Sequence, residues 1–307
     1  MDSEGQVSKH PSDRLHAEAS GQIVVRESRL RALQLERLPG WGQVLLFWAL
    51  YAALLGCFSP LSASFRGMWK GAFLGVVMSG ATIVLTLWLL RRSDWSASDV
   101  GLAFRRDSIF RFFAGGVCGL ALIALHYAII KSSVEGVTLE RVPEVGTRAI
   151  LVAIVAFVPL AAMEELGFRG YPLHKLHASW NLWTAQLVVA VAFATYHVVG
   201  GFPWIQALLG TGTGSILFGM AAIASRGLAL PIGLHAAWNI GGWSLGEKQE
   251  PGLWKIVVDP ASVNSAGAAG AISYFAVLGL ATFGFWLLYR SNESKDEMDS
   301  RARSKKA

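Results

Sequence analysis

Residues 71–90 read GAFLGVVMSGATIVLTLWLL and contain no Asp, Glu, Lys or Arg. An apolar α-helix of about 20 residues matches the thickness of the hydrocarbon core of a bilayer, roughly 30 Å. In lipid the backbone must satisfy its own hydrogen bonds, which only helices and closed barrels achieve. Barrel strands alternate apolar and polar residues over about ten positions, whereas this run is continuously apolar. The segment therefore predicts a membrane-spanning helix.

Similar runs recur along the chain of 307 residues, of which 53% are hydrophobic and only 16% charged. Soluble domains usually carry about a quarter charged residues. The sequence therefore predicts an all-α, polytopic membrane protein with eight spanning helices. They are expected at residues 41–61, 71–90, 112–130, 149–166, 182–198, 205–225, 228–245 and 268–289. Together they make a predicted membrane domain, 41–289, between an N-terminal tail, 1–40, and a basic C-terminal tail, 290–307.

The Lys and Arg residues indicate the orientation of this domain. If the N-terminus is cytoplasmic, 20 of the 27 Lys and Arg residues lie in cytoplasmic segments and 7 on the other side. Cytoplasmic loops carry an excess of positive charge, and an even number of spans returns the C-terminus to the cytoplasm. We therefore predict that both termini are cytoplasmic. The net charge of +6 follows from these anchors, so we expect membrane lipid, and no nucleic acid, as their partner.

The N-terminal tail has a segment of its own character. Residues 23–38 place Leu30 and Leu33 among Arg29 and Arg31, a pattern typical of an amphipathic helix on the membrane surface. A partly ordered tail is the alternative interpretation.

Ionisable side chains at membrane depth are costly and mark function by default. The first group lies in AAMEELGFRG, residues 161–170. Glu165 and Arg169 are four residues apart, so they share a helix face and can pair. Glu164 lies about 100° around the axis from Glu165 and is unpaired within its own helix. Glu164 is thus a candidate general base, while an ion pair that merely ends the helix is the alternative for Glu165 and Arg169.

Two further groups follow in later spans. His197 lies one helical turn after Phe193, and His235 and Asn239 lie four residues apart on one helix face. Each group alone could be a structural hydrogen bonder between helices. Together with Glu164 they supply a carboxylate, two imidazoles and an amide from three helices. This set suits a water molecule activated by carboxylate and imidazole, with His and Asn donors for an oxyanion.

The position of His197 is a difficulty for this interpretation. It lies late in a helix that runs outward, whereas Glu164 lies late in one that runs inward. The two side chains can meet if the helix of His197 is deep or tilted, or if its boundary is shifted by several residues. Another intramembrane histidine, His126, has no polar neighbour at helical spacing and is expected to pack between helices. His174 and His177 are expected in a loop or an interfacial segment, at the surface and not in the catalytic site.

The three motifs, Glu164-Glu165-x-x-x-Arg169, Phe193-x-x-x-His197 and His235-x-x-x-Asn239, resemble those of the type II CAAX prenyl endopeptidase family. This is the CPBP family, which includes proteins described as bacteriocin-processing. The resemblance covers about residues 149–245 and implies an eight-helix intramembrane endopeptidase that hydrolyses a peptide bond near the cytoplasmic face. The implied catalytic residues are Glu164 and His197, which activate water, and His235 and Asn239, which stabilise the oxyanion. The implied supporting residues are Glu165, Arg169 and Phe193.

The resemblance also implies what the site binds. A metal-free glutamate mechanism is favoured, and the alternative is a zinc ion held by Glu164, His197 and His235, with a water in the open position. The substrate is expected to be a peptide or protein, lipidated substrates included. A composition rich in Ala, Gly and Arg favours a bacterial cytoplasmic membrane. The competing interpretation is a non-catalytic scaffold or bacteriocin self-immunity protein, and a transporter is disfavoured because no internal repeat is evident.

Overall fold

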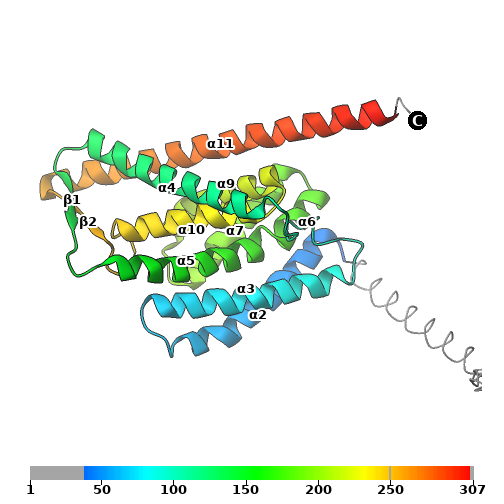
Figure 1. The fold of residues 1–307 in the computed structure, drawn as a ribbon, viewed down its shortest axis with the longest axis horizontal. Coiled ribbons are helices and arrows are strands. Elements are labelled where there is room, and N and C mark those ends of the chain that lie inside the picture. Colours follow the sequence, from blue (N-terminus) through cyan, green and yellow to red (C-terminus); the bar gives the residue numbers. More distant parts are fainter. Residues whose placement is uncertain (1–37, 249, 305–307) are drawn as a thin grey trace, which may run out of the picture.

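The computed structural model describes residues 38–248 and 250–304, and it shows a bundle of helices that run along one long axis (Figure 1). Apolar side chains on these helices face both the bundle interior and the outer surface, as expected where lipid replaces water. The helical elements are α2 (Gly40–Ser62), α3 (Met68–Leu90), α4 (Ser108–Ser133), α5 (Thr147–Phe168), α6 (Tyr171–Ser179), α7 (Leu182–Val199), α8 (Trp204–Gln206), the π-helix η1 (Ala207–Thr211), α9 (Gly212–Ser225), α10 (Ala229–Ser244), the 3₁₀ turn η2 (Pro260–Ser262) and α11 (Val263–Ser304).

Each of the eight predicted spans is helical, and the prediction of an all-α polytopic membrane protein is confirmed. Seven helical stretches of the described residues are long and apolar enough to cross a membrane. The exception is α10, which has 16 residues, fewer than the roughly 20 that cross a bilayer unaided. Its buried side chains include those of His235 and Trp243. This helix is therefore enclosed by its neighbours and does not need the length of a lipid-facing span.

Glycines bring α10 unusually close to α4. A Cβ atom added to Gly115 of α4 would lie 2.1 Å from the carbonyl oxygen of Leu230, and one added to Gly233 of α10 would lie 1.9 Å from that of Phe112. Real side chains do not fit at such distances. Small residues at these positions let the two backbones touch, as is common between membrane helices. The approach fixes α10, and with it His235, against the bundle.

We therefore expect Gly115→Ala to destabilise the fold. The added methyl group would force α4 and α10 apart, at a cost of about 1–3 kcal/mol. The matched control is Gly116→Ala on the same helix, where the nearest atom to an added Cβ lies 4.0 Å away. Thermal unfolding in detergent should show a lower midpoint for Gly115→Ala only. Equal midpoints would contradict the close packing of α4 and α10.

A two-stranded antiparallel sheet joins the long connections at one end of the bundle. Strand β1 (Val137–Arg141) follows α4, strand β2 (Trp254–Val258) precedes α11, and Val137 pairs with Val258. These strands were not predicted from the sequence. They lie at the same end as the turn between α2 and α3, opposite the C-terminal end of α11 (Figure 1).

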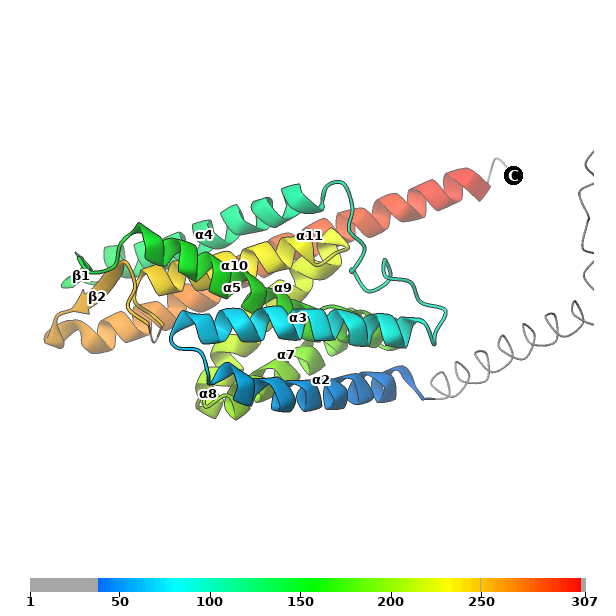
Figure 2. The same ribbon diagram turned by 60° about the horizontal axis from the view of Figure 1, so that its bottom comes forward.

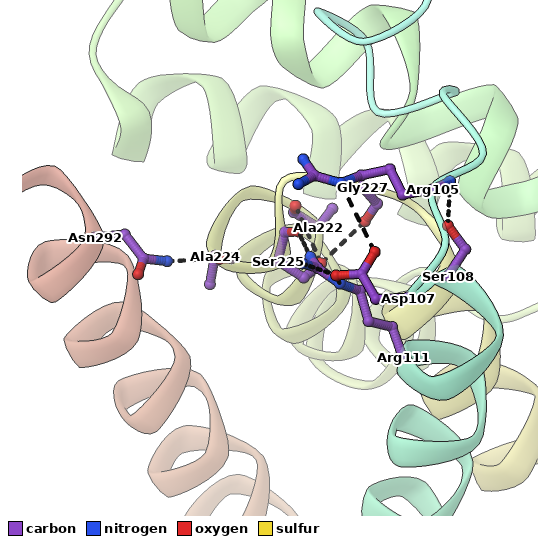
Figure 3. A network of polar contacts seen from close by, with 9 residues as sticks. All are labelled: Arg105, Asp107, Ser108, Arg111, Ala222, Ala224, Ser225, Gly227 and Asn292. Carbon is purple, nitrogen blue, oxygen red and sulfur yellow. Dashed lines mark hydrogen bonds and ion pairs between the residues drawn. The ribbon is translucent and has the colours of Figure 1, made fainter. Parts of the chain in front are cut away.

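Polar contacts tie the helices together at the other end of the bundle (Figure 3). Arg111 of α4 pairs with Asp107 and donates a hydrogen bond to the carbonyl oxygen of Ser225, where α9 ends. Asn292 of α11 donates to the carbonyl oxygen of Ala224, at 3.0 Å. The hydrogen bonds from Arg111 lower the pKa of Asp107, so the pair remains ionised at neutral pH. The turn from α9 to α10 is therefore held by both α4 and α11.

The predicted tails are only partly covered by the described residues. The amphipathic helix predicted for residues 23–38 lies outside them except for Leu38. At the other end, α11 continues unbroken from Val263 to Ser304. The predicted boundary at residue 289 therefore falls inside a helix, and the last part of the described chain extends the helix beyond the predicted span.

Candidate active site

The glutamate pair lies at the middle depth of the bundle. Tyr51, the central residue of the 23-residue helix α2, donates a hydrogen bond to the carbonyl oxygen of Met163 at 3.4 Å. Ser79, the central residue of the 23-residue helix α3, donates to the carbonyl oxygen of Pro159 at 3.3 Å. The second half of α5 is therefore level with the middles of two spanning helices. Glu164 accordingly lies near the centre of the membrane, where a charge is most costly.

The late half of α7 reaches the same depth. The ring of Phe168, the last residue of α5, lies 5.1 Å from the ring of Phe193 and 5.6 Å from that of Tyr196, both on α7. These edge-on and tilted contacts place His197 beside the end of α5. The late half of α7 therefore lies level with the end of α5, as a deep or tilted helix would place it.

One cavity collects the predicted catalytic residues. It has a volume of about 690 Å³, and its walls include apolar side chains from α3, α5, α9 and α11. A few polar groups in a largely apolar cavity are typical of a ligand or active site. The predicted residues that line it are Glu164, Phe193, His197, His235 and Asn239.

His235 lies between the two glutamates. Its Nδ1 atom is 2.8 Å from Glu165 Oε1, and its Nε2 atom is 3.6 Å from Glu164 Oε2. The imidazole is buried, and its ring stacks on that of Phe218 at 4.2 Å. An ionised Glu165 can only accept a hydrogen bond, so it keeps a proton on Nδ1. The Nε2 atom is then the side of the ring that faces Glu164 and the cavity.

Glu165 and Arg169 form a fully buried ion pair behind this site. The distance from Arg169 Nη1 to Glu165 Oε1 is 3.3 Å, and both side chains are 0% exposed. The guanidinium also lies over the ring of Phe193, at 4.2 Å, a cation–π contact. The predicted pairing is therefore present, but neither residue lines the cavity. Glu165 contacts His235 Nδ1 on the side of the ring away from the cavity. Because the side chains of Glu165 and Arg169 are both fully buried, they are not a surface ion pair that merely ends the helix.

Within the described part of the chain, His197 forms a hydrogen bond through one of its two ring nitrogens. Its Nδ1 atom lies 2.9 Å from the carbonyl oxygen of Phe193, and a carbonyl can only accept, so Nδ1 is the donor. In the neutral ring the lone pair is then on Nε2, the form that can take up a proton. The ring of Phe193 packs against the imidazole at 4.5 Å. Phe193 thus fixes both the tautomer and the position of His197.

Lys248 is a cavity residue that sequence reasoning missed. Its Nζ atom donates a hydrogen bond to Asn239 Oδ1, at 3.0 Å, and both residues line the cavity. An ammonium group only donates, so the contact fixes the amide oxygen and leaves the Asn239 NH₂ group for other partners. Lys248 follows α10 in a connection, at no helical spacing from Asn239. The adjacent charges of Glu247 and Lys248 directly after an apolar span were the available signal.

The arrangement does not fit the three-ligand zinc site considered from sequence. In residues 38–248 and 250–304, no three His, Cys, Asp or Glu side chains are grouped so that they could hold a metal ion. Glu164 and His235 are neighbours, with 3.6 Å between Oε2 and Nε2, whereas the hydrogen bond of His197 Nδ1 is to the carbonyl oxygen of Phe193. The residues in this geometry instead make a set of proton donors and acceptors.

The residues that the sequence analysis set aside have structural contacts. His126 of α4 is buried, and its Nδ1 atom lies 2.8 Å from the Ser273 hydroxyl of α11, as expected for a group between helices. Of the two alternatives for His174 and His177, a loop or an interfacial segment, only the loop is wrong, because both residues lie in helix α6 and are half-buried. The Nδ1 atom of His174 contacts the carbonyl oxygen of Arg169 at 3.0 Å, which ties α6 to the end of α5.

Comparison with known families agrees with the motifs. Residues 146–241 match the family model described as Rce1-like, type II CAAX prenyl endopeptidase Rce1-like. The matched segment contains all three motifs and extends from the start of α5 into α10. The resemblance identified from sequence is therefore confirmed over this part of the chain. No curated protein matches the chain.

Proposed function

We propose that this chain, which carries an Rce1-like type II CAAX prenyl endopeptidase segment, is an intramembrane endopeptidase that hydrolyses a peptide bond with an activated water. One observation carries the proposal: Glu164, His197, His235 and Asn239, from three helices, line a single cavity at the middle depth of the bundle. Polar residues that only hydrogen-bond one helix to another would not all need to face the same cavity.

In this proposal Glu164 and His197 activate the water. Glu164 has a side chain that is 13% exposed, in a cavity with apolar walls, and the Nε2 lone pair of His197 is available as a second proton acceptor. Water attacks the peptide carbonyl carbon, its proton passes to this carboxylate–imidazole pair, and the same proton later reaches the leaving amine. General acid–base catalysis of this kind contributes about 10²–10⁴-fold to a rate.

His235 and Asn239 are the proposed donors to the oxyanion of the tetrahedral intermediate. When His235 carries two protons, Nδ1 donates to Glu165 and Nε2 donates into the cavity. The Asn239 NH₂ group is the second donor, because Lys248 occupies the amide oxygen. Fixed donors in a water-poor site stabilise developing charge strongly. Glu165, Arg169 and Phe193 support the reaction by holding these groups in place.

We expect Lys248→Met to lower kcat about tenfold or more while KM changes little. Without the hydrogen bond from Lys248, the Asn239 amide can rotate, and its NH₂ group stabilises the oxyanion less well. If Lys248 acts through Asn239, adding Asn239→Ala to Lys248→Met should produce no further loss beyond that of Asn239→Ala alone. Initial-rate kinetics on the four proteins measure this coupling. Losses that multiply independently would contradict the positioning role.

We propose a metal-free glutamate mechanism, and the zinc mechanism is the alternative. The geometry that supports this choice is the hydrogen bonding of both histidines, which are arranged for proton transfer. Activity that survives a strong chelator would support it. Loss of activity that is restored by Zn²⁺ would favour zinc held by Glu164, His197 and His235.

The proposed substrate is a peptide or protein with an extended segment that reaches the middle of the bilayer, and lipidated substrates are included. The apolar walls of the cavity would accept apolar side chains or a lipid chain. The second candidate function is a non-catalytic scaffold or self-immunity protein of a bacterial cytoplasmic membrane. Such a protein would need no free base in a cavity.

A peptide panel tests the proposal. Purified protein in detergent would be incubated with prenylated and unmodified peptides, and products identified by mass spectrometry. We expect cleavage by the wild type and its loss in His197→Ala. The matched control is His177→Ala, a half-buried histidine outside the cavity, which should retain activity. Equal cleavage by wild type and His197→Ala would overturn the assigned site.

A further inference from the structure

A second cavity lies where α6, the end of α9 and the late part of α11 meet. It has a volume of about 350 Å³ and shares no lining residue with the cavity that contains Glu164. The side chains that matter for a ligand are His174 and His177 of α6, Arg226 directly after α9, and Tyr289, Glu293 and Asp296 of α11. None of these six residues takes part in the proposed reaction.

This cavity lies at the level where α11 leaves the apolar part of the membrane. Residues 263–289 contain no Asp, Glu, Lys or Arg, whereas eight of residues 290–304 are charged, and the last turns of α11 extend past the end of the bundle (Figure 1 and Figure 2). Tyr289 lies at the change, as aromatic residues often do at a membrane–water interface. Just before it, Leu287 and Leu288 are 50% and 45% exposed, so lipid chains can lie along the same helix. The cavity is therefore at the depth of lipid headgroups.

Several groups in this cavity can accept hydrogen bonds from a ligand. His174 Nδ1 donates to the carbonyl oxygen of Arg169 at 3.0 Å, so Nε2 carries the lone pair in the neutral ring. Glu293 accepts the hydroxyl of Tyr289, and a carboxylate has lone pairs for further donors. The buried Nδ1 atom of His177 has no hydrogen-bond partner in residues 38–248 and 250–304. A ligand with several N–H donors, such as a primary ammonium group, fits this set.

The charges around the cavity favour a ligand that carries both signs. Glu293 and Asp296 supply two carboxylates, and Arg226 supplies one guanidinium, which pairs with Asp296. The lining therefore carries one negative charge more than it carries positive charges, and an ammonium group compensates this excess. Arg226 can contact a phosphate as well as Asp296, because a guanidinium has five N–H donors. A purely anionic headgroup would add to the negative excess.

The backbone at Arg226 also points to a role for its side chain. Its φ is +53°, and no other non-glycine residue that the structure describes has a positive φ. Glycine adopts this left-handed conformation without a steric penalty, so glycine would suit this turn better than arginine. Such conformations are found where the surrounding structure or a function maintains them. The guanidinium is the part of Arg226 that the turn itself does not need.

We propose that this cavity binds the headgroup of an ethanolamine phospholipid. The primary ammonium group donates to His174 Nε2 and to the Glu293 carboxylate, and Arg226 contacts the phosphate. A choline headgroup cannot make the same contacts, because its quaternary nitrogen has no N–H to donate. The proposal goes beyond the peptidase activity and does not depend on it.

Native mass spectrometry of delipidated protein tests this proposal. Phosphatidylethanolamine, phosphatidylcholine and phosphatidylglycerol with identical acyl chains would be added at equal concentration, and the fraction of protein that retains each lipid compared. We expect about tenfold or greater preference for the ethanolamine lipid, as hydrogen bonds to charged groups supply. Equal retention of the three lipids would overturn the proposal. Binding of soluble phosphoethanolamine in calorimetry, without retention of the lipid, would assign the cavity to a free ligand and overturn the lipid as its occupant.

Two variants locate the binding site. Glu293→Gln should reduce retention of the ethanolamine lipid to that of the choline lipid, whereas Glu297→Gln, the same change at an exposed α11 residue outside the cavity, should leave it unchanged. Arg226→Gly should also weaken retention, and it should fold normally because glycine suits the left-handed backbone. Undiminished retention in Glu293→Gln and Arg226→Gly would show that the lipid binds elsewhere and would overturn the proposal.

Discussion

Glu164→Gln should lower kcat by roughly 10³-fold or more, within the range expected for removal of a general base. Gln keeps the size and shape of the side chain and can still contact His235, but it cannot take a proton from water. KM should change little, because the lost interaction matters mainly in the transition state. Initial rates in detergent, with the best peptide from the panel, measure the effect.

The matched control for this substitution is Glu140→Gln, an identical change at an exposed residue of β1 away from the cavity. It should leave both kinetic constants unchanged. Thermal unfolding would confirm that Glu164→Gln remains folded, and removal of a buried carboxylate could even raise its stability. Full activity in Glu164→Gln would refute its role as the base and favour a scaffold with the same fold.

Local spacing predicted the pairs that lie within one helix. Residues at i and i+4 share a helix face whatever surrounds them, so the contact between Glu165 and Arg169 and the common exposure of His235 and Asn239 to the cavity could be anticipated. Contacts between helices could not. The hydrogen bond from His235 to Glu165 depends on how deeply α10 packs against α5, and that packing is set by the glycines at the α4 interface.

The seven long apolar helices were predictable because lipid imposes a long, largely uncharged apolar run on each spanning helix. The differences occur where a segment is shielded from lipid or lies outside it. Helix α10 is short because the bundle encloses it, and β1 and β2 pair across connections that carry no strong strand pattern.

Arg169→Leu should destabilise the fold severely. The substitution removes the positive partner of Glu165, which is 0% exposed, and leaves its carboxylate uncompensated at membrane depth. Breaking a buried pair in this way costs about 3–5 kcal/mol. We expect a markedly lower thermal midpoint in detergent and little folded protein after purification. Without Arg169, Glu165 would no longer be held as a carboxylate that accepts the hydrogen bond from His235 Nδ1. Any protein that still folds should therefore be inactive.

The double substitution Glu165→Leu/Arg169→Leu separates the two consequences. Replacing both members of a buried pair by apolar residues is often neutral or stabilising, so the double variant should regain much of the stability that Arg169→Leu loses. Activity should stay lost, because no carboxylate then holds the Nδ1 proton of His235. A double variant that recovers both stability and activity would show that the pair only supports the fold. A double variant that recovers neither would show that the packing of Arg169 over the ring of Phe193 matters more than its charge.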